Sequence, residues 1–303
     1  MKRGYLFFIL TIFAVFIISF ASANIFSDLW GKVTGKATSG TTALNITVQS
    51  NPPTIPYVDA ISAANPTESG TKAIQFNFTA SDGNGPSYLN DTTAKASFQM
   101  AGQATRSNTS CLPYAAVGNN KNYTCTIYMW YFDKPGSWTI NVSIQDTLGN
   151  YVENSTTTFT YNTLTSMTMS PTSLTWSAIT LASSNIGSSN NPIIINNTGN
   201  KQISNINITA YDLRGETTQT QYIYANNLSV DNVTAGCSGT SMLNATSINV
   251  TTAWIYSGNN TLNYNNGTSG QEPLYFCLKG VPQSISSQSY SSAAYGSWTV
   301  MMI

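Results

Sequence analysis

The residue pattern with the clearest chemical meaning is the tripeptide Asn-x-Ser/Thr, whose Asn amide nitrogen accepts an N-linked glycan in exported proteins. The pattern occurs fifteen times in 303 residues. The chain holds 33 Asn, 41 Thr and 37 Ser, so its composition alone also produces such triplets by chance. The acceptor positions are Asn45, Asn77, Asn90, Asn108, Asn122, Asn141, Asn154, Asn196, Asn207, Asn227, Asn232, Asn244, Asn249, Asn259 and Asn266.

The placement of several triplets favours their use as glycosylation sites. Side chains alternate between the two faces of a strand. In the segment 73–79 this puts Asn77 and Thr79 on one face and Phe76 and Phe78 on the other. The glycosylation triplet then faces water while its neighbours build a core. The same alternation recurs at 140–144 and 206–209.

Four cysteines form the second set of reactive side chains: Cys111, Cys125, Cys237 and Cys277. A metal or redox site needs close Cys-x-x-Cys spacing or histidine partners, and the sequence has neither. Disulfide bonds are therefore predicted. Four cysteines allow three pairings, which spacing alone does not separate.

The charged residues argue against catalysis and against nucleic-acid binding. Lys and Arg number 12, Asp and Glu number 12, and only 8% of residues are charged, against roughly 25% in a typical soluble domain. A neutral chain lacks the basic patch that neutralises phosphates. The absence of histidine removes the Ser-His-Asp triad, and the acidic residues are scattered singly. We expect a non-enzymatic protein without a cofactor.

One Gly-rich segment is a weak candidate for a metal site. Asp82 and Asn84 lie in Ser81-Asp-Gly-Asn-Gly-Pro86, which resembles part of a calcium loop, with Asp59 and Asp91 as possible further oxygen ligands. Calcium takes six to eight oxygens, and the acidic residue that would close such a loop is absent. A plain turn is the favoured interpretation.

An aromatic run is the remaining candidate for a binding surface. Strand alternation places Tyr128, Trp130 and Phe132 on one face, with Trp138 nearby. The run would either stack on sugars or fill a core, and we expect the core.

The first 23 residues have the features of a secretory signal. Lys2 and Arg3 precede the apolar run Tyr5–Phe20, and Ala21-Ser22-Ala23 offers a cleavage site before Asn24. Two alternatives stay open. The run through residue 23 is long enough for an uncleaved membrane anchor, and Arg3-Gly4 resembles the processing site of type IV pilin-like precursors, whose apolar helix is retained. All three place the residues after Asn24 outside the cytoplasm, beginning with a flexible leader at 24–43.

The rest of the chain predicts strands separated by turns, hence an all-β fold. Seven strands in residues 44–162 have the spacing of an antiparallel sandwich. The predicted strands are 44–49, 55–61, 73–80, 94–100, 123–131, 138–145 and 152–161.

The segment from Pro135 through Trp138 to Asp146, with Gly149-Asn150 and the strand ending at Tyr161, resembles the last hairpin of Ig-like modules in bacterial and archaeal exported surface proteins. Residues 163–303 form a second expected β-sandwich, similar to modules of archaeal envelope proteins. Its predicted strands lie within 169–176, 192–200, 203–213, 247–256, 261–265, 274–279 and 297–303, with a mobile loop at 283–294. Only the pairs Cys111–Cys125 and Cys237–Cys277 keep each bridge inside one module.

These expectations describe an extracellular, glycosylated protein of two tandem Ig-like sandwiches. The resemblance implies an adhesion, surface-layer or appendage component whose partners are other envelope proteins or cell-surface glycans, with self-association also open. Membrane contact would run only through residues 5–23 if they are not cleaved. The alternatives are a filament subunit, pilin-like or strand-exchanged, and a carbohydrate-binding module.

Overall fold

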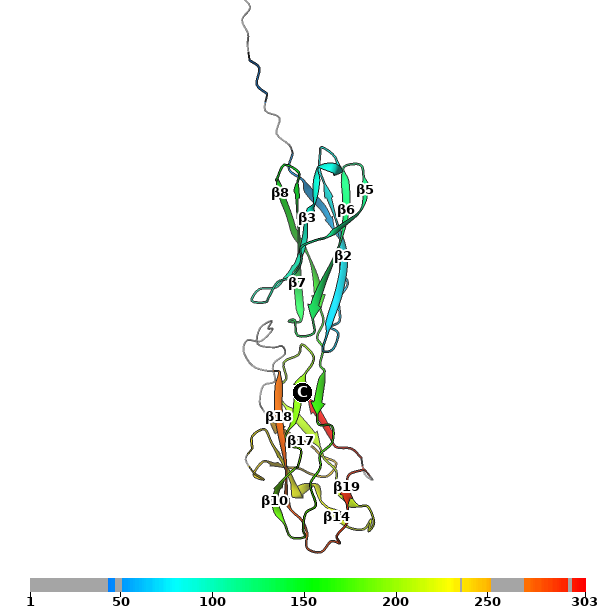
Figure 1. Cartoon of the computed structure of the whole chain (residues 1–303), viewed down its shortest axis with the longest axis vertical. Helices are drawn as coiled ribbons and strands as arrows, with labels where there is room; N and C mark the ends of the chain where they lie inside the picture. The colour runs from blue at the N-terminus through cyan, green and yellow to red at the C-terminus, as the bar shows by residue number, and fades with distance from the viewer. Residues whose placement is uncertain (1–42, 47–50, 235, 252–269, 294–295) are drawn as a thin grey trace, which may run out of the picture. The chain divides into compact units, whose positions relative to one another are not determined.

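The computed structural model describes residues 43–46, 51–234, 236–251, 270–293 and 296–303 (Figure 1). The chain divides into the units 1–49 and 50–303. Of the first unit, residues 43–46 have no regular secondary structure, and Leu44 and Ile46 are exposed. The strand predicted from residue 44 is therefore wrong over residues 44–46. The predicted signal, the rest of the leader and residues 47–49 lie outside the described part.

Unit 50–303 is built from antiparallel β-sheets, as the sequence predicted. Regular helix in the described residues is limited to two short 3₁₀ turns, Pro86–Tyr88 and Ala225–Asn227. None of the described helices is long and apolar enough to cross a membrane.

Two four-stranded sheets enclose the first core. One has the order β1-β2-β6-β5 and the other the order β4-β3-β7-β8. The strands are β1 (Thr54–Val58), β2 (Thr71–Ser81), β3 (Leu89–Gln99), β4 (Arg106–Asn108), β5 (Leu112–Val117), β6 (Asn120–Trp130), β7 (Gly136–Asp146) and β8 (Tyr151–Tyr161).

Strict alternation along these strands produces the first core. In β7, Trp138, Ile140, Val142 and Ile144 are all fully buried, whereas the residues between them are at least partly exposed. Phe78 of β2 stacks on Tyr123 of β6 with ring centroids 5.1 Å apart. The core side chains form one continuous cluster, because the buried positions alternate along β2, β6 and β7 and are almost all apolar.

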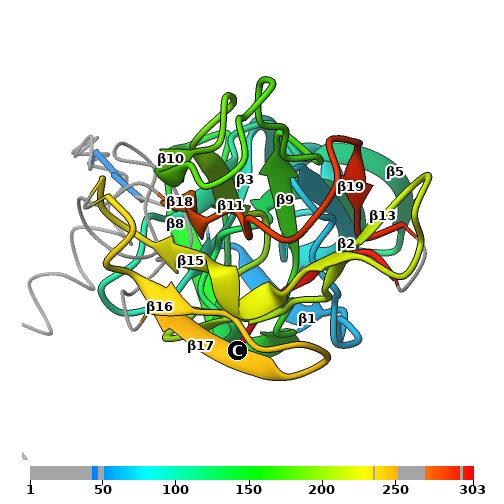
Figure 2. The same cartoon turned by 90° about the horizontal axis from the view of Figure 1, so that it is seen from below.

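Residues 163–303 form three further sheets (Figures 1 and 2). Their orders are β16-β15-β18-β11-β9 with β10 also pairing β18, β17-β12-β20, and β14-β13-β19. The strands are β9 (Met167–Ser170), β10 (Ser184–Gly187), β11 (Ile193–Asn197), β12 (Ile206–Thr209), β13 (Leu213–Gly215), β14 (Tyr222–Ile223), β15 (Leu228–Asp231), β16 (Thr240–Ser241), β17 (Ser247–Thr251), β18 (Gln271–Gly280), β19 (Tyr290–Ser291) and β20 (Thr299–Met302).

This half of the unit departs from the prediction in several places. Strands β10, β14, β15 and β16 lie outside every predicted strand, and residues 171–176 of the predicted strand 169–176 are not in a strand. Residues 203–213, predicted as one strand, contain β12 and the start of β13, which belong to different sheets. The predicted loop 283–294 contains β19, and its Gln288 and Tyr290 side chains hydrogen-bond to Gln221. These contacts hold the segment on the protein. The predicted strand 261–265 lies outside the described residues.

Candidate functional site

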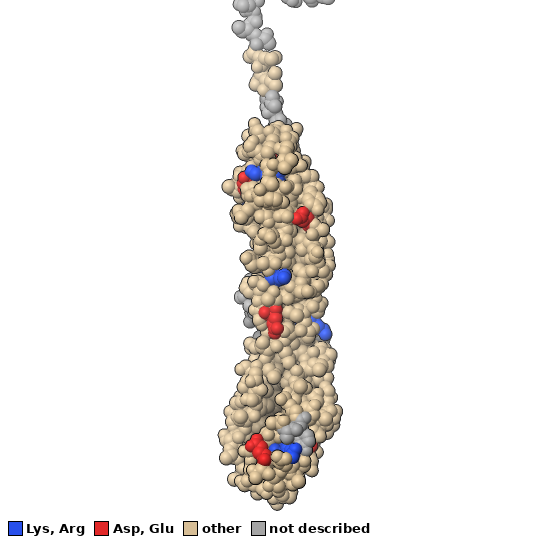
Figure 3. Space-filling model, turned by 90° about the vertical axis from the view of Figure 1, so that its right-hand side faces the viewer, with Lys and Arg blue, Asp and Glu red and all other residues tan. Residues whose placement is uncertain are grey.

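The acceptor asparagines lie on the surface of the sheets. Thirteen of the fifteen fall in described residues, and each of these thirteen is exposed or partly exposed. Asn259 and Asn266 lie outside that part. By contrast, Asn197 and Asn200 are buried and do not begin a glycosylation triplet. The view in Figure 3 shows few charged side chains among a large uncharged surface, so the outward polar groups are mainly amides and hydroxyls.

Two glycosylation triplets lie directly opposite each other on β2 and β6. The register pairs Asn77 with Thr124 and Thr79 with Asn122. The Thr79 hydroxyl donates to Asn122 Oδ1 at 2.8 Å. The two asparagines therefore share one outer sheet face, opposite the buried Phe78 and Tyr123, as the alternation predicted for Asn77 and Thr79.

Several of the acceptor asparagines use their side-chain amide nitrogen in a hydrogen bond inside the protein. Asn77 Nδ2 donates to Asp59 Oδ2 at 2.9 Å, Asn108 Nδ2 to the Thr126 carbonyl at 2.9 Å and Asn154 Nδ2 to the Ile55 carbonyl at 3.0 Å. A glycan replaces one Nδ2 hydrogen and leaves the other, so a sugar at these three positions preserves the internal bond only if it takes the hydrogen that does not donate.

A second pair of triplets meets on β12 and β17. The register places Asn207 opposite Asn249, while the intervening Ile208 is fully buried. Asn249 Nδ2 donates to Asn205 Oδ1 at 3.1 Å. Sheets from both halves of unit 50–303 thus carry paired acceptors on an outer face.

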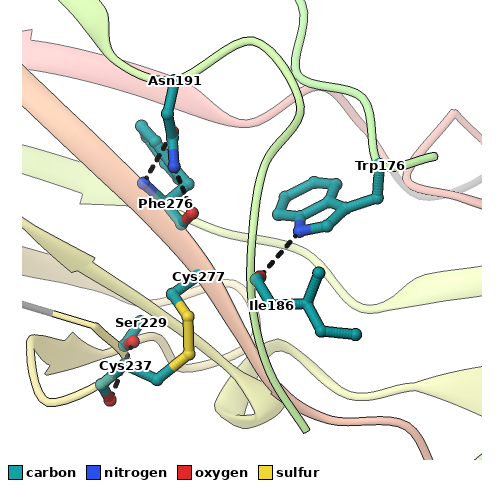
Figure 4. The surroundings of a disulfide bond; sticks show 7 residues. All are labelled: Trp176, Ile186, Asn191, Ser229, Cys237, Phe276 and Cys277. Atoms are coloured by element: carbon teal, nitrogen blue, oxygen red, sulfur yellow. Dashed lines mark hydrogen bonds between the residues drawn. A yellow bond between two sulfur atoms is a disulfide. The ribbon is translucent and has the colours of Figure 1, made fainter. Parts of the chain in front are cut away.

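The four cysteines form two disulfides, Cys111–Cys125 and Cys237–Cys277, with Cα atoms 4.6 and 5.2 Å apart. These are the pairs expected inside each module. Cys125 lies on β6 and Cys277 on β18, each a central strand. Figure 4 shows the second bridge, where the Ser229 hydroxyl donates to the Cys237 carbonyl at 3.2 Å. Disulfides of this kind are characteristic of oxidising compartments.

The candidate calcium loop gains no second carboxylate. Asp82 is fully buried, its Oδ1 accepts the Asn84 N–H at 2.8 Å, and its Oδ2 has no hydrogen-bond partner. Asp59 binds Asn77, and Asp91 binds Lys121 and Tyr123. Within the described residues, no group of three or more His, Cys, Asp or Glu side chains is placed to hold a metal ion.

The aromatic run is oriented differently from the prediction. The inward residues of β6 are Tyr123, Cys125, Ile127 and Met129, so Tyr128 points outward and is 58% exposed. Trp130 is partly exposed and stacks on Phe132 at a centroid distance of 5.6 Å. Phe132 lies beyond the end of β6, where strand alternation no longer sets the direction of the side chain, and it is buried. The expected core orientation is thus wrong for Tyr128, and it holds for Phe132 and for the fully buried Trp138.

A buried ion pair was not predicted. Arg106 Nε lies 3.0 Å from both carboxylate oxygens of Asp133, and the Arg106 guanidinium packs over the Phe132 ring. Burial raises the pKa of Asp133, and the hydrogen bonds and positive charge of Arg106 act in the opposite direction. The two residues are 27 positions apart in loops and short strands, so no local sequence pattern signals the pair.

No family model and no curated protein matches this chain. Among solved structures it is similar to dimeric latent PorU from Porphyromonas gingivalis, with 13% sequence identity and a TM-score of 0.28. The match covers 88% of this chain and 21% of that protein, so the chain spans about a fifth of the length of PorU. A likeness at this level carries no functional argument.

Proposed function

We propose that the protein is an exported, N-glycosylated component of a cell envelope, acting in adhesion or surface structure without catalysis. Residues 1–23 would direct export, and two Ig-like sandwiches at 44–162 and 163–303 would display the surface. In this proposal the sugars supply the hydration that charged side chains give to other proteins, because a nearly uncharged surface otherwise favours self-association.

The observation that carries the proposal is the pairing of glycosylation triplets on outer sheet faces. Asn77 and Asn122 share one face, and Asn207 lies opposite Asn249 on another. Both pairs point away from the core, which is the orientation that an attached glycan requires. The two disulfides give independent support for an oxidising compartment.

Glycopeptide mapping of the protein from its native host tests the proposal. We expect sugar on several described acceptors, with higher occupancy at Asn122 than at Asn77, because the bond to Asp59 leaves only one Nδ2 hydrogen of Asn77 for the sugar to replace. Substitution Thr124→Ala should abolish occupancy at Asn122 and leave Asn77 unaffected, whereas Thr79→Ala should act only on Asn77. Unmodified peptides at all acceptors would overturn the proposal.

The outward Tyr128 and the partly exposed Trp130 favour a second candidate, a carbohydrate-binding surface. Aromatic faces of this kind stack on apolar sugar faces. Binding on a glycan array that is lost in Tyr128→Ala and Trp130→Ala would support it. Thermal unfolding of both variants would show that the loss is not caused by misfolding, and binding unchanged by both substitutions would exclude this surface.

A further inference from the structure

The second half of the unit contains a cavity that the proposed function does not use. Its volume is about 280 Å³. The buried side chains there form two clusters, one around Ile193 and Phe276 and another around Ile223 and Leu228. Residues of both clusters line the cavity, so it lies where the two clusters meet. The first core, by comparison, is one continuous cluster.

Two tryptophans in the wall present carbon surface to the cavity. Trp176 Nε1 donates to the Ile186 carbonyl at 3.0 Å (Figure 4), and Trp298 Nε1 donates to the Tyr211 carbonyl at 2.8 Å. Both indole N–H groups are therefore satisfied by the protein itself. The indoles can therefore make hydrophobic and dispersion contacts with a bound molecule, and that molecule does not need to supply a hydrogen-bond acceptor for them.

The remaining wall has hydroxyl groups and no charge. Thr172, Ser173, Ser292 and Ser297 are its polar members, and the other lining residues are aliphatic or aromatic. None of the lining residues is Asp, Glu, Lys or Arg. An ionised ligand would lose its hydration there without gaining a counter-charge, whereas one neutral hydroxyl would find a hydrogen-bond partner.

We propose that this cavity binds a single uncharged molecule with an aliphatic chain and one hydroxyl end. An apolar cavity of about 150 Å³ takes one benzene molecule. Scaled to this volume, the occupant has about eleven non-hydrogen atoms, the size of a ten-carbon alcohol. A sugar fits the wall poorly, because ten of the fourteen lining side chains are aliphatic or aromatic and its several hydroxyls would find few side-chain partners in place of water.

Calorimetric titration of the full-length, disulfide-bonded protein with 1-decanol tests the proposal. We expect saturable binding of one decanol per chain. Decanoate, of the same chain length but charged, should bind at least tenfold more weakly, and methyl glucoside should not bind. Absence of saturable decanol binding, or decanoate binding as tight as decanol, would overturn the proposal.

A matched pair of substitutions localises the binding. Val300 and Ile248 flank Ile208 in the same row of the β17-β12-β20 sheet, and both are partly buried. Only Val300 lines the cavity. Val300→Phe should weaken decanol binding at least tenfold, and Ile248→Phe should leave it unchanged. Equal effects of the two substitutions would place the binding elsewhere and refute the proposal.

A measurement on the unsubstituted protein covers the case in which Val300→Phe does not fold. A bromine atom at the end of the alkyl chain quenches indole fluorescence on contact, and Trp176 and Trp298 both line the cavity. Titration with 10-bromo-1-decanol should quench fluorescence in step with the calorimetric saturation. Saturable binding without quenching would contradict occupancy of this cavity.

Discussion

At the scale of single residues, the first half of the unit contains a buried ion pair between Arg106 and Asp133. Both side chains are over 90% buried. The Asp133 carboxylate also accepts the Trp130 N–H at 2.7 Å. Removing one partner of such a pair leaves an uncompensated charge in the interior, which costs far more than the pair contributes.

Arg106→Met should therefore lower the free energy of unfolding by about 3–5 kcal/mol, measured by urea denaturation. The control is Lys121→Met, which breaks the more exposed pair with Asp91. That substitution should cost less than about 1 kcal/mol. Similar losses in the two variants would show that burial does not set the cost of the Arg106 pair.

Two buried tyrosines make stability fall in alkaline solution. Burial raises the pKa of Tyr123, and its hydrogen bond to Asp91 and the negative charge of Asp91 raise it further. Burial also raises the pKa of Tyr161, with a further increase from the charge of Asp133. The unfolded chain releases these protons first, at about pH 10. The contribution of these two tyrosines to the free energy of unfolding is thus complete below about pH 10 and is lost as the pH rises above it.

We expect the free energy of unfolding to fall above about pH 10 by about 1.4 kcal/mol per pH unit for each tyrosine. Urea denaturation at a series of pH values measures the slope. Tyr123→Phe should make the decline shallower, because the unfolded state then has one fewer phenol to ionise. An unchanged slope in this variant would exclude Tyr123 as a source of the effect.

At the scale of elements, the turn between β11 and β12 is closely fitted to the segment 162–166. Asn200 is fully buried, its Nδ2 donates to the carbonyls of Asn162 and Asp133, and its Oδ1 accepts the Leu164 N–H at 2.6 Å. A Cβ atom on the neighbouring Gly199 would overlap the Leu164 carbonyl and lie 3.0 Å from the Ser166 nitrogen. These are backbone atoms, so a larger residue forces the chain to shift.

Gly199→Ala should consequently destabilise the protein by about 1–3 kcal/mol, the usual cost of overpacking. Thermal or urea unfolding measures it. Gly280→Ala is the matched control, because a Cβ at Gly280 meets no atom within 4 Å. If the two alanine variants are equally stable, the close approach to Leu164 does not constrain the turn.

The long strands were predictable because their alternation is strong. The sequence pattern located β2, β6, β7 and β8, each with predicted ends within a few residues of those in the structure. The short, largely exposed β5 was missed, since it buries no apolar face. The predicted inward orientation of Tyr128 was wrong. The side chains of β6 that point inward are fixed along the whole strand, and its alternating buried positions begin at Tyr123.

The candidate sites divide in the same way between local and long-range information. Outward orientation of Asn77 follows from alternation, a local property. The pairing of its triplet with that of Asn122, the Arg106–Asp133 contact and the cavity beside Trp176 and Trp298 each join segments far apart in sequence. Such juxtapositions depend on strand register and side-chain packing, which composition and periodicity do not specify.

At the scale of the whole molecule, the proposed function combines export, disulfide formation and glycosylation in one protein. Cys111–Cys125 and Cys237–Cys277 each bridge residues within one of the two halves of unit 50–303. The outer sheet faces carry many amide and hydroxyl groups and few charges, such as Lys95 and Glu153. Under the proposed function, an oxidising compartment would account for the disulfides and a glycan coat would hydrate the weakly charged surface.

The intact mass of the protein from its native host tests this account most directly, recorded before and after chemical deglycosylation and with thiol alkylation before and after reduction. The account predicts an excess mass that deglycosylation removes, an amino terminus beyond Met1, and four cysteines that alkylate only after reduction. An unmodified polypeptide that starts at Met1 and has four freely alkylated thiols would contradict it.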